Sequence, residues 1–130
     1  MPLSSKVLLD AQVQLRRIYN LLSEVMSLTG ELAGAIDRDD NVAIRMLVTM
    51  RAEPISKIRL AQRALREQLR GLTEEEGARL VALLDGAAPE EEAEKPLAAQ
   101  VGTNRRLLDQ VIAADQRVNR RLTREKSVYR

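Results

Sequence analysis

The side chains that most often carry out catalysis or bind transition metals are largely missing from this chain of 130 residues. It contains no cysteine and no histidine. Disulfides, thiolate nucleophiles, histidine bases and Cys/His metal sites are therefore excluded. No glycine lies in a phosphate-binding loop that ends in Lys and Ser or Thr. An active site made of two carboxylates from different helices is still compatible with this composition. We nevertheless expect a protein that is not an enzyme and needs no cofactor.

One acidic cluster, at residues 37–41, has the composition of a calcium loop but not its spacing. A calcium-binding loop needs Gly at its sixth position and Glu at its twelfth. Counted from either Asp37 or Asp39, both positions hold hydrophobic residues. We therefore interpret the cluster as a turn in which Asp39 or Asp40 caps the next helix, and we predict no metal site.

The composition instead favours binding through long helices. Hydrophobic residues make up 45% of the chain and charged residues 31%. The only aromatics are Tyr19 and Tyr129, and no nucleic-acid-binding signature occurs, so we expect no nucleic-acid partner. No apolar run approaches the ~20 residues of a membrane helix, and residues 1–10 lack a signal-peptide core. We therefore expect no membrane insertion and a soluble protein that stays in the cytoplasm.

Charge is distributed unevenly, although the net charge is only +2. Residues 1–72 carry 11 basic and 8 acidic groups, residues 73–95 carry 2 and 8, and residues 96–130 carry 8 and 3. The basic C-terminal block is either a solvated helix face or a means of attracting an acidic partner. The arginines that would steer such a partner are Arg117, Arg120, Arg121 and Arg124. We interpret residues 86–96, which hold an acidic run, as a solvated linker without structure of its own.

Hydrophobic residues repeat every three or four positions in the first half of the chain and predict two long helices. The first helix, over 5–37, follows a serine that can cap it. Its heptad seam consists of Leu8, Ala11, Leu15, Ile18, Leu22 and Val25. The second covers 40–71 and contains Pro54, which lacks an amide donor and clashes with the preceding turn. We expect either a kink near Pro54 or two helices, over 40–51 and 54–71.

Two further helices are predicted in the second half. Thr73 and Glu76 have the spacing of a capping box, which opens a short helix over 73–85. The last helix, over 96–124, has the most regular seam of the chain. That seam consists of Leu97, Val101, Asn104, Leu108, Val111, Asp115, Val118 and Leu122, and Ile112 widens it. Its two polar members either find buried partners or face water where the seam is uncovered.

These elements predict an all-α fold in a single helical domain over residues 1–130. Two long helices form an antiparallel bundle or coiled-coil hairpin, to which the short third helix and the long amphipathic C-terminal helix are added. Residues 123–130 are expected to form a mobile tail. Such a module either closes a bundle with its last helix or offers an apolar groove to a helix of another protein.

The order of these elements resembles the FlgN-type flagellar export chaperones, and the related FliT type is similar at this level. The resemblance rests on the long first helix, the turn at 37–41 and the Arg-containing second helix from Ile44 to Ile55. It also rests on the sequence Thr-Asn-Arg-Arg-Leu-Leu at 103–108, near the start of the final helix. It extends over nearly the whole chain.

This resemblance implies a cytoplasmic chaperone that binds the terminal helical segment of flagellar hook-associated or cap proteins. Such a chaperone prevents premature assembly of its client and delivers it to the type III export apparatus. The client would dock on the last helix. The implied client-binding residues are Asn104, Leu108, Val111, Ile112, Asp115, Val118 and Leu122. The alternative is a structural or regulatory coiled-coil protein that forms a homodimer through its heptad seams.

Overall fold

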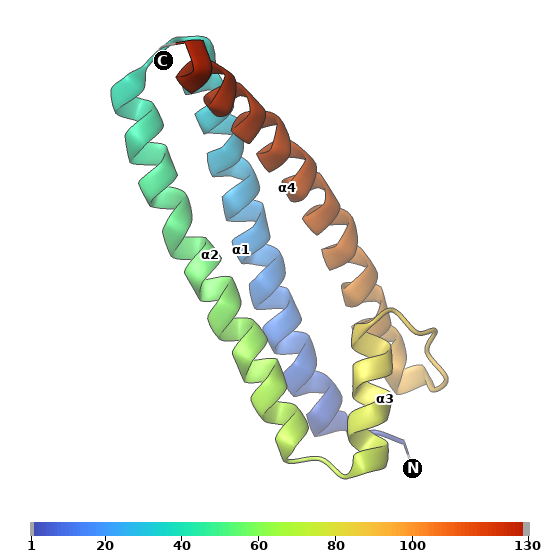
Figure 1. The fold of residues 1–130 in the computed structure, drawn as a ribbon. Helices are drawn as coiled ribbons and strands as arrows, with labels where there is room; N and C mark the ends of the chain where they lie inside the picture. The colour runs from blue at the N-terminus through green and yellow to red at the C-terminus, as the bar shows by residue number, and fades with distance from the viewer. Residues whose placement is uncertain (1, 129–130) are drawn as a thin grey trace.

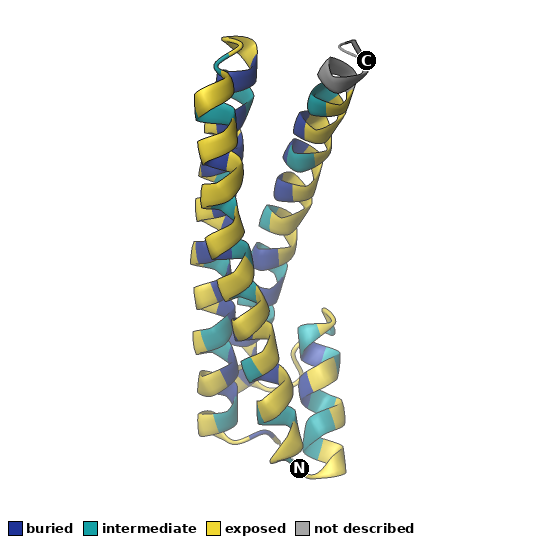
Figure 2. Ribbon diagram, turned by 60° about the vertical axis from the view of Figure 1, so that its left-hand side comes forward, coloured by how far each residue is buried: buried dark blue, intermediate teal, exposed yellow. Residues whose placement is uncertain are grey.

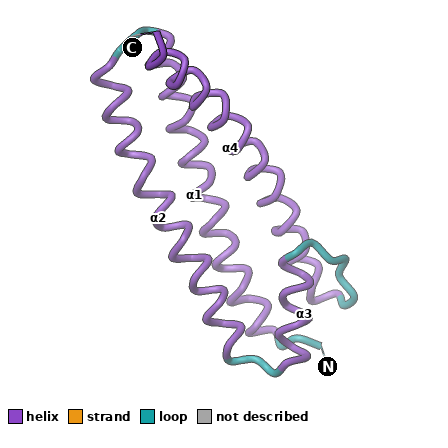
Figure 3. The backbone as a smooth tube through the Cα atoms, viewed as in Figure 1, coloured by secondary structure: helices purple, strands orange, loops and turns teal. Residues whose placement is uncertain are grey.

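The structure, a computed structural model, describes the backbone of residues 2–128 and the side chains of residues 2–123. This part of the chain is helical without any strand (Figures 1 and 3). In chain order its elements are α1 (Ser5–Asp37), α2 (Asn41–Arg70), α3 (Glu74–Leu84), the 3₁₀ turn η1 (Glu92–Glu94) and α4 (Lys95–Val128). The predicted all-α fold of long helices is confirmed. No described helix is long and apolar enough to cross a membrane.

The three long helices lie side by side, with α1 in contact with both α2 and α4 (Figure 1). α2 runs back along α1, and α4 then runs in the same direction as α1. Between residues 2 and 128, no Cα atom of α2 lies within 8 Å of a Cα atom of α4. α3 lies at the end of the bundle that holds the N-terminus, beside the start of α4. α1 is therefore the central helix, and α2 and α4 cover different sides of it.

Side-chain caps define where the first three α-helices begin. The Ser4 hydroxyl accepts a hydrogen bond from the Val7 amide, and the Asp40 carboxylate accepts one from the Ala43 amide. Of the two aspartates proposed for the turn, Asp40 is the cap, whereas Asp39 has a positive φ of 53°. The predicted capping box between Thr73 and Glu76 at the start of α3 is present. The Thr73 amide lowers the pKa of Glu76 by donating to its carboxylate.

Pro54 lies inside α2, which continues through it as one helix. Of the two alternatives, the division into helices over 40–51 and 54–71 is therefore wrong. The Pro54 side chain is buried, on the same stripe of α2 as Leu47, Ala61 and Leu65. A proline in a helix interior costs ~3 kcal/mol. The packing of this stripe against α1 offsets that cost and keeps the helix continuous.

Two clusters of buried side chains form the core, and in both of them α1 supplies the central residues. The larger cluster includes Leu15, Leu22, Ala61, Leu65, Leu80, Leu83, Leu97, Val101 and Val111. The smaller cluster, toward the turn between α1 and α2, includes Leu28, Leu32, Ala35, Ile36, Leu47 and Val118. Buried residues gather on the inward sides of the long helices, and the other residues are intermediate or exposed (Figure 2). The predicted seam of the first helix is thus covered by α2 and α4 of the same chain.

The segment before α4 and the end of α4 differ from expectation. Residues 86–96 are not simply a solvated linker, because η1 lies within them and Glu94 is buried. The last helix begins at Lys95 and continues to Val128, past the expected end at residue 124. The expected mobile tail over 123–130 is therefore helical as far as the structure describes it, and residues 129 and 130 lie outside the described residues.

Candidate binding groove

A groove lies between α2 and α4, with α1 as its floor. It holds a hollow of about 260 Å³ whose lining is mostly apolar. The hollow is lined by Leu15, Ile18, Leu22, Gln62, Leu65, Leu84, Val101, Asn104, Arg105 and Leu108. All four α-helices contribute to it, and the three floor residues from α1 are 5–8% exposed. The groove exists because α2 and α4 both pack on α1 without closing over it.

Asn104 is the polar seam residue inside this groove, and its hydrogen-bonding groups are satisfied. Its amide donates to the backbone carbonyl of Leu15 over 2.8 Å, and its side-chain oxygen accepts from Gln100 over 2.9 Å. The side chain is 8% exposed. Of the two alternatives for the polar seam positions, a buried partner therefore holds for Asn104. Its bond to Leu15 fixes the register of α4 on α1, because sliding either helix would break it.

The structure divides the apolar residues expected to bind a client. Val111 and Val118 are buried in the two core clusters, and Leu122 packs partly against the smaller one. Leu108 and Ile112, in contrast, are 42% and 46% exposed. Leu108 also lines the hollow, so it is the predicted residue best placed to contact a ligand in the groove. The seam predicted from the sequence contains both core and surface residues, because both kinds recur at similar helical spacing.

Asp115, the second polar seam residue, forms an ion pair with Arg51 of α2. The Arg51 side chain is 12% exposed and the Asp115 side chain 37%. Since α2 and α4 have no close backbone approach, this pair is a direct polar link between them. The Nε atom of Arg51 is buried without a hydrogen-bond partner, so the pair is the main compensation for taking this guanidinium out of water.

The arginines expected to steer a client lie in different surroundings. Arg121 donates to the carboxylate of Asp37 at the end of α1, and Arg120 donates to the Gln116 carbonyl of its own helix. Arg117 and Arg121 line a second hollow of about 260 Å³ between α1 and α4. Arg117 and Arg120 remain exposed. The side chain of Arg124 lies outside the described residues.

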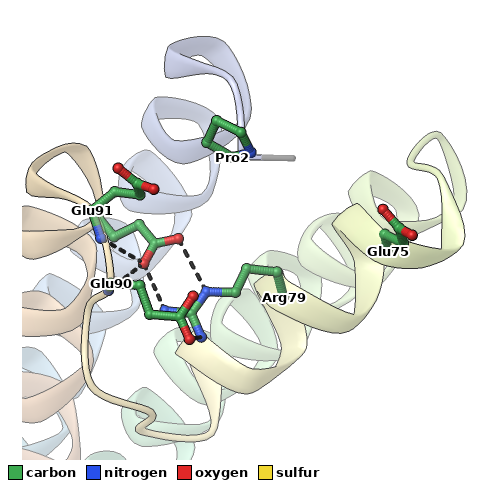
Figure 4. A pocket seen from close by; sticks show the side chains of 6 residues that line it. Pro2, Glu75, Arg79, Glu90 and Glu91 are labelled. Atoms are coloured by element: carbon green, nitrogen blue, oxygen red, sulfur yellow. Dashed lines mark hydrogen bonds and ion pairs between the residues drawn. The ribbon is translucent and has the colours of Figure 1, made fainter.

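A buried ion pair that the sequence did not indicate fastens the segment before α4 to α3. Glu94 is 2% exposed and accepts two hydrogen bonds from Arg79, of 3.1 and 2.6 Å. Its carboxylate also accepts from the backbone amides of Glu90 and Glu91. Figure 4 shows Arg79 reaching from α3 toward the loop that carries these two residues. Within the acidic run, Glu90 and Glu94 thus pair with Arg79, whereas Glu92 pairs with Lys95.

This arrangement shifts the ionisation of Glu94. The hydrogen bonds from Arg79 lower the pKa of Glu94 to about 2, and the amide of Glu90 acts in the same direction, although burial opposes both. Glu94 is therefore ionised at neutral pH. A weak signal existed in the sequence, because Arg79 is the only basic residue between 73 and 94. The next basic residue along the chain is Lys95, which pairs with Glu92 instead.

Neither a metal centre nor an established relative defines a function for this chain. Among the described residues, no three acidic side chains are arranged to hold a metal ion. Comparisons with protein-family models, with curated protein sequences and with solved structures find no match. The groove between α2 and α4 is therefore the feature on which a functional assignment has to rest.

Proposed function

We propose that this protein binds an amphipathic helical segment of another protein in the groove between α2 and α4. The single observation that carries the proposal is the apolar hollow, whose lining includes the exposed side chain of Leu108. A helix laid along the groove would place its apolar side chains in the hollow and leave its polar face in water. Ile112 lies one turn after Leu108 on the same side of α4 and extends the contact.

Charge around the groove favours an acidic client. Arg105 lines the hollow, and Arg59 and Arg66 lie one turn before and after Gln62 on the same face of α2. Both Arg59 and Arg66 are exposed and have no ion-pair partner in the part of the chain that the structure describes. Carboxylates along the polar face of a client helix would pair with them and raise the rate of encounter.

The proposed client follows from the resemblance to the FlgN-type chaperones. In this proposal the protein is a cytoplasmic export chaperone, and its client is the terminal helical segment of a flagellar hook-associated or cap protein. Binding keeps the client from assembling before export and presents it to the type III export apparatus. What supports this assignment is the order of the helices together with an apolar groove of the kind that a helical client needs.

The test is a titration of the purified protein with terminal segments of hook-associated and cap proteins from the same genome. We expect one of them to bind with 1:1 stoichiometry. In the double variant Leu108→Asp/Ile112→Asp, the affinity should fall by at least about tenfold, because carboxylates would be desolvated against the client. Val81→Asp is the matched control, since Val81 is 41% exposed but lies on α3 outside the lining of the groove.

Two results would overturn the proposal. Absence of binding by every such segment would remove the export-chaperone assignment. Binding that the double variant leaves unchanged would show that the groove is not the docking site. Circular dichroism of each variant establishes that helicity is retained, so a loss of binding is not a loss of fold.

A further inference from the structure

A second apolar surface lies on α2, away from the groove. Four of its residues are large, hydrophobic and strongly exposed: Val42 at 78%, Met46 at 58%, Met50 at 47% and Leu60 at 59%. They recur at intervals that keep them on one side of the helix. Exposed apolar residues gathered on one face usually indicate an interaction surface, whereas isolated ones do not.

The position of this stripe follows from its neighbours on α2. Leu47 packs on α1, and Arg51 reaches Asp115 on α4. At about 100° per residue, Arg51 lies roughly 40° from Leu47 in one direction, whereas Met50 and Met46 lie roughly 60° and 100° in the other. The stripe therefore faces away from α4, on the opposite side of the α1–α2 hairpin from the groove.

Charged residues divide this face into two apolar parts. Glu53 and Lys57 lie on the stripe between Met50 and Leu60, and their side chains form an exposed ion pair of 3.2 Å along the helix. Counted from the N-terminal end of α2, the stripe reads apolar, acidic, basic, apolar. Two copies of such a stripe, placed antiparallel, bring acidic residues opposite basic ones and apolar residues opposite apolar ones.

The neighbouring helix repeats this order of charge at the same level of the hairpin. The Gln68 side chain donates to the Val7 carbonyl over 2.8 Å and so aligns the two antiparallel helices. With this alignment, Ile55 on α2 lies level with Asn20 on α1. Arg17 and Glu24 lie on either side of that level, both exposed and both without an ion pair among the described residues. Along the hairpin, the midpoint between Arg17 and Glu24 is thus level with the midpoint between Glu53 and Lys57.

We infer that this face of the α1–α2 hairpin binds a second copy of the chain, with the two α2 helices antiparallel across a twofold axis near Ile55. In this arrangement Met50 lies opposite Leu60 of the second copy, and Glu53 lies opposite its Lys57. Arg17 of each α1 lies opposite Glu24 of the other. Each of these contacts occurs twice, as a closed twofold interface requires.

This interface differs from pairing through the heptad seams, because most residues of those seams are buried in the core clusters of each chain. It also leaves the groove between α2 and α4 open on the outer side of each copy. The inference therefore does not depend on the proposed function, and a dimer of this kind would carry two grooves facing outward.

The oligomeric state and its response to charge reversal test the inference. Light scattering on a sizing column should give twice the monomer mass of 14.6 kDa for the unchanged chain. Glu53→Lys alone and Lys57→Glu alone each place like charges opposite each other twice, so the dissociation constant of the dimer should rise by at least about tenfold. The double variant Glu53→Lys/Lys57→Glu restores opposite charges across the axis and should restore the dimer.

A second pair of variants separates this face from the groove. Met46→Glu/Leu60→Glu should be monomeric with unchanged helicity, whereas Leu108→Asp, which acts on the groove, should remain a dimer. A monomer at every concentration of the unchanged chain would overturn the inference. Persistence of the dimer in Met46→Glu/Leu60→Glu would also overturn it. The same holds if the double charge-reversal variant forms a dimer no tighter than that of either single variant.

Discussion

The two halves of α4 are attached to the molecule by different means. At its start, Leu97 packs with Leu80 and Leu83 of α3, and all three are at most 1% exposed. Just before the helix, Glu94 forms an ion pair with Arg79. After Leu107, Val111 and Val118 of α4 pack into the two core clusters, and the polar links are the partly exposed pairs from Asp115 to Arg51 and from Arg121 to Asp37. The start of α4 is therefore enclosed, whereas its second half has exposed apolar residues, Leu108 and Ile112, on one side.

If α4 binds a client as proposed, this difference gives the two halves separate tasks. The enclosed start supplies stability, because fully buried leucines and a buried ion pair are expensive to disrupt. The second half carries Leu108 and Ile112, which are 42% and 46% exposed. A surface used for binding has to remain accessible, so it is expected where packing is incomplete. Three substitutions test this division, from the largest expected effect to the smallest.

Leu83→Ala in α3 should cause the largest loss of stability. Leu83 has no exposed surface, and truncation of a buried leucine to alanine costs about 3 kcal/mol through lost transfer energy and the cavity left behind. Urea unfolding followed by circular dichroism measures the change. Val81→Ala on the exposed side of α3 should change the free energy of unfolding by less than about 0.5 kcal/mol. Equal effects of the two variants would contradict the enclosed packing of α3 on α4.

Glu94→Gln should destabilise the protein by about 2 kcal/mol at pH 7, because Arg79 loses its charged partner. The pKa of Glu94 is about 2 in the folded protein, below its ordinary value of 4.5. A lowered folded-state pKa stabilises the fold above the unfolded pKa and loses this contribution as the pH falls. The difference between the two proteins should therefore shrink between pH 4.5 and 2.

Glu92→Gln is the control for Glu94, since the Glu92 side chain is 87% exposed and, among the described side chains, pairs with Lys95 alone. Its effect should stay below about 1 kcal/mol and be reduced by salt. If Glu94→Gln behaved in the same way, with no dependence on pH in the acid range, the ion pair between Glu94 and Arg79 would not hold the start of α4.

Asp115→Asn should have the smallest effect on global stability, about 1 kcal/mol, because this ion pair is partly exposed. Its local effect should be larger. Amide hydrogen exchange in α4 beyond residue 111 should accelerate, while exchange over residues 97–104 stays unchanged. Asp109→Asn, on the exposed side of α4, should alter neither region. Uniform acceleration along α4 would show that the two halves open together.

The helices themselves were predictable from the sequence, because their caps and seams are local. Thr73 and Glu76 are three residues apart, and the seam of α1 repeats with helical spacing over the whole helix. The alternative of two helices divided at Pro54 was wrong because the cost of proline is local, whereas the packing that offsets it comes from α1. Local preference is overridden in this way wherever a residue faces a well-filled core.

The candidate groove was predictable only in part. The sequence placed Leu108, Val111 and Val118 on one stripe, but it could not show which of them α1 would cover. The partner of Glu94 lies 15 residues away, across a turn and a change of helix, and Arg51 lies 64 residues from Asp115. Such pairs depend on how the helices are placed in space, which neither spacing nor composition specifies.

The central place of α1 also has a consequence for the order of folding. Its contacts with α2 close a hairpin, whereas its bonds to α4 join residues 89 and 84 positions apart in the chain. Contacts between residues distant in sequence form later, because closing a longer loop costs more entropy. During synthesis, the α1–α2 hairpin therefore emerges while one side of α1 still lacks its cover. In that interval the nascent chain presents to its surroundings the leucines that α4 later encloses.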